Sequence, residues 1–79
     1  MNLKVCYHGG NSSGDSGYWL GFDYDAEMVE TLKRKIPHVD RIWDDQQKLW
    51  FVKEAYDETL CKLFSNFYAL AHLQGKLEL

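Results

Sequence analysis

The sequence predicts a small α+β domain in the order ββαββα, with a mostly antiparallel four-stranded sheet and two helices on one face of it. Two observations carry this prediction. Segments with alternating apolar residues occur in two pairs, and each pair is followed by a segment with apolar residues at helical spacing. The chain length limits the number of domains, because 79 residues suffice for one domain with one core. We therefore expect a single domain over 1–79.

The first pair of strands is predicted over 2–8 and 18–24. In the first strand apolar and other side chains alternate, as in a half-buried strand: Leu3, Val5 and Tyr7 against Lys4, Cys6 and His8. In the second strand one face carries Tyr18, Leu20, Phe22 and Tyr24. The intervening segment 9–17 is rich in Gly, Ser, Asn and Asp, which favour turns, and it predicts a flexible hairpin loop. It lacks the lysine of a phosphate-binding loop and leads into a strand, so it does not predict a phosphate site.

A first helix is predicted over 26–36. Asp25 is a natural N-cap, and Pro37 cannot continue a helix. Acidic residues lie near the start and basic residues near the end, which suits the helix dipole. The apolar positions fall at helical spacing: Met28, Val29, Leu32 and Ile36.

The second half repeats this pattern. Strands are predicted over 39–44 and 48–53, and period-two geometry places Arg41 beside Trp43 and Trp50 beside Val52. A second helix is predicted over about 55–74, with Gly75 as its C-terminal cap. Its apolar stripe consists of Tyr56, Leu60, Leu63, Phe64, Phe67, Leu70 and Ala71.

Composition and charge narrow the functional classes. The net charge of −3 argues against strong nonspecific nucleic-acid binding. The charges are unevenly placed, however, because 33–53 holds six basic and three acidic residues, while the rest of the chain carries −6. No apolar run approaches the ~20 residues that cross a membrane, and the N-terminus lacks the apolar stretch of a signal peptide. We expect a cytoplasmic protein that has no membrane partner and keeps Cys6 and Cys61 as reduced thiols.

No residue pattern predicts catalysis or metal binding. Cys6 and His8 share a strand face, but Cys61 and His72 would lie about 16 Å apart along one helix, too far to complete a tetrahedral site. The carboxylates occupy helix starts and turns, where they serve capping and solubility. We expect neither an enzyme nor a bound cofactor.

The tryptophans allow two interpretations. Trp19, Trp43 and Trp50 on strands can simply be core residues, because large rings stabilise a small core. Alternatively, exposed rings beside cations form a platform on which the bases of a single strand stack. The candidate nucleic-acid-binding residues are Lys33, Arg34, Lys35, Arg41, Trp43, Lys48 and Trp50.

The segment from Phe22 to Asp57 resembles a small βαββ module that accompanies helicases of the SNF2 and DEAD-like superfamilies, including the HARP domains of annealing helicases. The resemblance rests on Tyr24-Asp25, Leu32-Lys33, Lys35-Ile36-Pro37, Arg41-x-Trp43-Asp44 and Lys48-x-Trp50-x-Val52. It implies an accessory domain that engages single-stranded or branched DNA, with Arg41, Trp43, Lys48 and Trp50 at the matching positions. The join between Pro37 and Arg41, and Lys53 in place of a proline, depart from the pattern, and no helicase motor is present in the sequence.

Two functions remain open at this point. The first is a non-enzymatic, nucleic-acid-associated accessory module that uses the basic, tryptophan-bearing hairpin. The second is a protein-interaction adaptor or homo-oligomerising domain without a nucleic-acid role. The second would use an apolar patch on the last helix, where Tyr68 and Leu73 lie off the predicted stripe.

Overall fold

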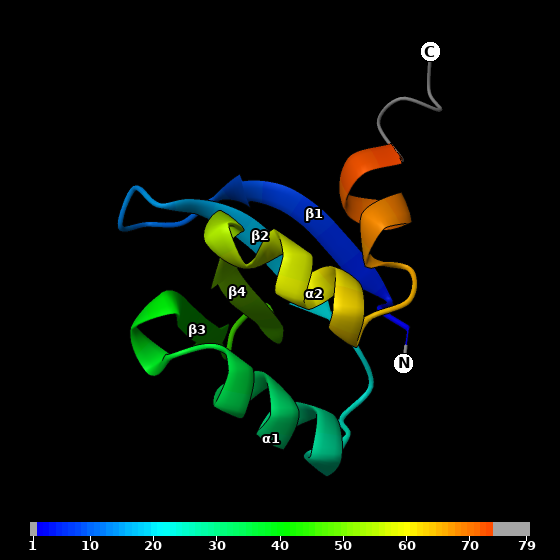
Figure 1. Ribbon diagram of the computed structural model, residues 1–79. Helices are drawn as coiled ribbons and strands as arrows, with labels where there is room; N and C mark the ends of the chain where they lie inside the picture. Colours follow the sequence, from blue (N-terminus) through cyan, green and yellow to red (C-terminus); the bar gives the residue numbers. More distant parts are fainter. Residues whose placement is uncertain (1, 74–79) are drawn as a thin grey trace.

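The computed structural model describes residues 2–73 and has the predicted order ββαββα (Figure 1). The four strands form one sheet that is antiparallel throughout, in the order β1-β2-β4-β3. The strands are β1 (Val5–Gly10), β2 (Ser16–Gly21), β3 (Arg41–Asp44) and β4 (Leu49–Lys53), and the helices are α1 (Ala26–Lys35) and α2 (Asp57–Leu63). Short helical turns cover His38–Asp40, Glu54–Tyr56 and Ala69–Leu73. The predicted cap at Gly75 lies outside the described residues.

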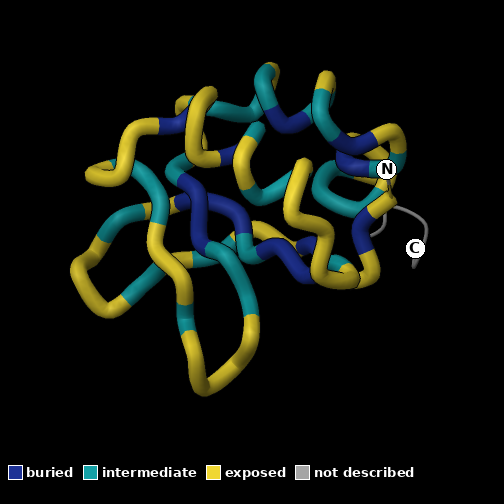
Figure 2. The backbone as a smooth tube through the Cα atoms, turned by 90° about the horizontal axis from the view of Figure 1, so that it is seen from below, coloured by how far each residue is buried: buried dark blue, intermediate teal, exposed yellow. Residues whose placement is uncertain are grey.

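Both helices pack on one face of the sheet, as predicted (Figure 1). Leu32 of α1 and Leu60 of α2 are fully buried in the same core as Leu20 of the central strand β2. The strand register carries this face across the sheet, in the row Cys6, Leu20, Trp50 and Trp43 and in the row His8, Tyr18, Val52 and Arg41. Figure 2 shows that the buried segments lie inside the molecule and the exposed ones at the loops and outer turns. We call this side of the sheet the helix face and the other side the open face.

The prediction for the buried side of the first strand was wrong. Cys6 is 5% exposed on the helix face, whereas Val5 and Tyr7 are 41% and 44% exposed on the open face. Period two defines two faces but does not say which of them the helices will cover. Leu3 is buried, but it lies before the strand begins.

Several strand boundaries also differ from the prediction. Strand β1 begins at Val5, not at residue 2, and β3 begins at Arg41, not at residue 39, because a short helical turn covers His38–Asp40. The first hairpin loop spans only 11–15, because the strands continue through Gly10 and from Ser16. The loop is held by Asn11, whose Oδ1 accepts from the backbone N–H groups of Ser13 and Asp15 at 3.0 Å each. Strand β2 ends at Gly21, so Tyr24 leaves the sheet and is 83% exposed.

Helix α1 forms as predicted. Asp25 Oδ1 accepts from Met28 N at 3.0 Å, which satisfies one of the free amides of the first turn. The helix ends at Lys35, and the following Ile36 is extended because Pro37 disfavours helical backbone before it. Leu32 and Ile36 are fully buried.

The prediction of one helix over 55–74 was wrong. Helix α2 ends at Leu63, Phe64 is extended, and a π-helical turn follows only at Ala69–Leu73. The break is fixed by Asn66, which accepts from Leu3 N at 2.8 Å and donates to Leu3 O at 2.9 Å. Phe67 then turns into the core, with its ring centroid 4.9 Å from that of Tyr18. Within residues 2–73 no helix has the length and apolar character needed to cross a membrane.

Candidate functional site

Trp43 and Trp50 form a cross-strand pair at the edge of the helix face. Their Cα atoms are register partners, and their ring centroids lie 5.2 Å apart at an interplanar angle of 55°. Trp50 lies on central strand β4 and packs against the core, whereas Trp43 lies on edge strand β3 and is 44% exposed. The strand register therefore places Trp50 against the core, where it supports the ring of Trp43, and leaves the Trp43 ring available to a ligand.

A groove of about 310 Å³ runs between this pair and helix α1. A smaller cavity of about 80 Å³ adjoins it and is lined in addition by Leu20, Phe22 and Lys48. We call the two together the tryptophan groove. Its main part is lined by Tyr24, Val29, Lys33, Trp43 and Trp50. Tyr24 and Val29 were not among the predicted site residues, because periodicity assigned both to buried faces. The Tyr24-Asp25 pair of the resemblance was the one signal that pointed here.

Two lysines reach this groove. Lys33 lies one helical turn after Val29 on α1 and lines the main part. Lys48, at a positive φ of 59°, lines the smaller cavity, and its Nζ lies 3.0 Å from Asp45 Oδ1. The same carboxylate oxygen accepts from Trp43 Nε1 at 3.4 Å. The hydrogen bond from Lys48 is the main reason that the pKa of Asp45 is lowered.

The other three predicted cations do not join the groove. Arg41 donates from Nε to Ile36 O at 2.9 Å, so it caps the end of α1. Arg34 donates to Thr31 Oγ1 at 3.3 Å on another side of α1. Lys35 is exposed and lines neither part of the groove. The structure thus brings together four of the seven predicted residues: Lys33, Trp43, Lys48 and Trp50.

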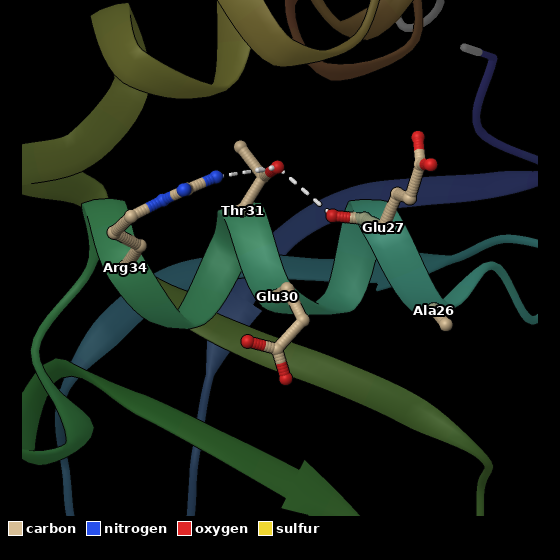
Figure 3. Close-up of a pocket in the computed structure, with 5 residues that line it drawn as sticks. All are labelled: Ala26, Glu27, Glu30, Thr31 and Arg34. Carbon is tan, nitrogen blue, oxygen red and sulfur yellow. Dashed lines mark hydrogen bonds between the residues drawn. The ribbon is translucent and has the colours of Figure 1, made fainter.

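Arg34 lines a separate depression on the surface of α1 (Figure 3). The Thr31 hydroxyl accepts from Arg34 and donates to Glu27 O at 2.9 Å, while Glu30 is directed the other way (Figure 3). All five lining residues come from the same helix: Ala26, Glu27, Glu30, Thr31 and Arg34. Because no second element faces them, they form an open helix surface that does not enclose a ligand.

A polar cluster centred on Asp57 lies at the start of α2. Its carboxylate accepts from the Tyr18 hydroxyl at 2.5 Å and lies 2.6 Å from His72 Nε2 and 3.8 Å from Cys61 Sγ. The Tyr18 hydrogen bond is the largest cause of the lowered pKa of Asp57. Burial, followed by the nearby Asp57 charge, raises the pKa of the Cys6 thiol to about 12. The cluster ties the last helical turn to α2 and β2.

The break in the second helix brings together two possible metal ligands that were predicted to lie too far apart. Cys61 and His72 do not sit about three turns apart on one helix, since both reach Asp57. Cys6 and His8 do share the helix face, as predicted from their spacing. Among the described residues, no group of three histidine, cysteine or carboxylate side chains has the geometry of a metal site.

Comparison with known proteins assigns no family. No protein-family model matches the chain, and neither a curated protein nor a solved structure matches it.

Proposed function

We propose that this chain is a non-enzymatic accessory module that binds single-stranded nucleic acid, including the single-stranded arm of a fork, in the tryptophan groove. One observation carries the proposal. An exposed Trp43 ring is backed by Trp50 and stands across a groove from Tyr24, with Lys33 and Lys48 beside it. Aromatic faces next to cations are the usual means of holding single strands.

Stacking supplies the affinity in this proposal. A base inserted into the groove contacts Trp43, which Trp50 holds from behind, and Tyr24 offers a second ring with 83% of its surface exposed. Stacking one base on an aromatic side chain contributes roughly 1–3 kcal/mol. Both tryptophans are also positions at which the chain resembles the helicase-associated modules.

The lysines set the salt dependence. If Lys33 and Lys48 each neutralise one phosphate, the logarithm of the binding constant falls with the logarithm of salt with a slope of about −1.4 for a single strand. The overall charge of −3 repels phosphates elsewhere on the surface, so binding is weak and confined to the groove. Arg41 has no part in it, because its side chain caps α1.

The test is fluorescence anisotropy of a labelled oligothymidylate at low salt. Trp43→Ala should weaken binding about 5- to 150-fold, the factor that corresponds to one stacked base. The matched control is Tyr68→Ala, which removes an aromatic side chain that is 55% exposed and lies outside the groove. Likewise Lys33→Ala should weaken binding and flatten the salt slope, whereas Lys35→Ala on the same helix should change affinity little. Equal effects of the two members of either pair would reject the groove.

The alternative function is a protein-interaction adaptor or a self-associating domain. It is favoured by the exposure of Tyr68 and Leu73, which are 55% and 37% exposed beside the last helical turn. Sedimentation velocity over a range of concentrations separates the two proposals. A rising sedimentation coefficient that Tyr68→Ala abolishes, together with no binding of oligothymidylate, would favour the adaptor.

A further inference from the structure

Strand β3 is an edge of the sheet, and its outer side is uncovered. It pairs with β4, and within residues 2–73 no backbone hydrogen bond links Ile42 or Trp43 to any other element. At the opposite edge of the sheet, the last helical turn packs against β1 (Figure 1). An edge strand without an outer neighbour presents unpaired N–H and C=O groups, which another extended chain can satisfy.

The side chains around β3 do not protect this edge. Val39, Ile42 and Trp43 are large and apolar, yet they are 64%, 48% and 44% exposed. The two charged residues of the strand are used within the chain, since Arg41 Nε caps α1 and the Asp44 carboxylate accepts from its own turn. Charged side chains directed to solvent are a usual protection of edge strands. The apolar edge of β3 therefore favours pairing with another strand.

The hydrogen bonds of the hairpin indicate which backbone groups of β3 point outward. Asp44 O accepts from Lys48 N at 2.8 Å, so the backbone of Asp44 is turned towards β4. In an antiparallel pair, successive residues turn their backbone groups to opposite sides. Ile42 therefore faces β4 as Asp44 does, and the N–H and C=O groups of Trp43 point away from the sheet.

We propose that β3 pairs with β3 of a second copy of this chain, antiparallel and about a twofold axis at Ile42. In this register each Trp43 N–H donates to the Arg41 carbonyl of the other copy. On the helix face the Trp43 ring then lies opposite the Arg41 cation, and on the open face Ile42 lies opposite its own copy. An axis at Trp43 is disfavoured, because it would place Ile42 opposite the Asp44 carboxylate.

The charges of α1 suit the same twofold axis. This helix is the one beside β3, since Lys33 lines the tryptophan groove together with Trp43 (Figure 1). A twofold axis perpendicular to the sheet sets the two copies of α1 antiparallel on the helix face. The helix carries Glu27 and Glu30 near its start and three basic residues, 33–35, at its end, so opposite charges face each other. This self-complementarity favours a second copy over a segment of another protein.

The size of the interface predicts a weak dimer. The strand contributes only four residues from each copy, so we expect an interface below the standard size and an association that depends on protein concentration. The pairing continues the sheet across both copies and sets two tryptophan grooves on one face of it. That one nucleic-acid strand would cross both grooves rests on the proposed function, whereas the dimer itself does not.

Sedimentation velocity of the full chain over a range of concentrations tests the pairing. The sedimentation coefficient of the parent chain should rise with concentration. Ile42→Lys sets two like charges across the axis and should weaken the dimer about tenfold or more. The matched control is Val5→Lys, which adds the same charge at an aliphatic residue that is 41% exposed on the open face of β1, and it should change little. An equimolar mixture of Ile42→Lys and Ile42→Glu should restore the dimer, because lysine then faces glutamate.

Hydrogen exchange tests the backbone bonds without any variant. The N–H of Trp43 should exchange more slowly as the concentration of the parent chain rises, because it becomes bonded to the second copy. The N–H of Ile42 faces β4 and should keep its rate. Equal changes at both positions, or at neither, would contradict the proposed strand pair.

Several results would overturn the inference. A parent chain that stays monomeric throughout would reject it, as would a dimer that Val5→Lys weakens equally, that Tyr68→Ala abolishes or that the mixture fails to restore. A tighter dimer of Ile42→Lys would place the axis at Trp43 and reject the proposed register. Oligothymidylate separates the dimer from the proposed function. Its binding to a strict monomer would reject the pairing and keep the groove, whereas a dimer that does not bind it would keep the pairing and reject the groove.

Discussion

Removal of the Asp57 carboxylate should destabilise the fold, because the buried Tyr18 hydroxyl then loses its hydrogen-bond acceptor. The Tyr18 hydroxyl donates to Asp57 at 2.5 Å, and Tyr18 is only 4% exposed, so Asp57→Ala leaves this hydroxyl buried without an acceptor. A buried polar group that loses its partner costs roughly 1–3 kcal/mol. The pair with His72 is about one-third exposed and adds at most about 1 kcal/mol. We expect the free energy of unfolding to fall by about 2–3 kcal/mol.

A double-mutant cycle isolates the Tyr18–Asp57 hydrogen bond. In the Tyr18→Phe background the hydroxyl is absent, so Asp57→Ala should cost about 1 kcal/mol less than it does in the parent chain. The assay is urea unfolding at pH 7 with unchanged m-values. Asp23→Ala is the control, because its pair with Lys4 at 2.9 Å is largely exposed and contributes little. Additive costs within about 0.5 kcal/mol would refute the proposed coupling.

The same carboxylate predicts a pH dependence. Hydrogen bonding from Tyr18 is the largest cause that lowers the pKa of Asp57 in the folded state, while burial opposes it. The unfolded chain therefore binds this proton at a higher pH than the folded chain, near the ordinary aspartate pKa of about 3.9. The stabilisation is fully present above that pH and is lost as the pH falls through the lower, folded pKa. The stability difference between the parent chain and Asp57→Ala should accordingly shrink below about pH 4.

Three further predictions concern the fold. Gly17→Ala should destabilise the chain by about 1–3 kcal/mol, because an added Cβ would lie 2.2 Å from a backbone oxygen of β4, whereas Gly10→Ala should be neutral in the same thermal melts. Asn66→Ala should cost about 1–3 kcal/mol and speed hydrogen exchange at the N-terminal segment, because it removes both hydrogen bonds that hold that segment; unchanged exchange would contradict this role. At pH 8, Cys61 should react with a thiol reagent before Cys6, which is buried and has a pKa of about 12; equal rates would contradict that assignment.

Local signals in the sequence determined the element order and helix α1. Asp25, the apolar spacing of Met28 and Leu32, and the stop at Pro37 act within a few residues of one another, so they can be recognised without knowing the rest of the fold. The sequence also identified four residues of the tryptophan groove, Lys33, Trp43, Lys48 and Trp50. Their aromatic and basic side chains belong to one predicted hairpin and to the end of one predicted helix, so they could be recognised from the sequence.

Contacts between distant parts of the chain decided the rest. Apolar spacing continues past Leu63, but the helix ends because Asn66 binds the backbone of Leu3, 63 residues earlier. Arg41 was expected to bind nucleic acid, yet the return of β3 beside α1 makes it a cap.

At the two faces of the sheet, too, the sequence decided one property and the tertiary structure another. Period two fixed which side chains share a face, but the helices determined which face is buried, so Cys6 is in the core and Tyr7 is not. The strand register then aligned Tyr7, Trp19, Phe51 and Ile42 into one row. The sequence alone thus determined the element order, helix α1 and the tryptophan hairpin. Only the tertiary structure decided the tryptophan groove, because the groove depends on which strands and which helix become neighbours.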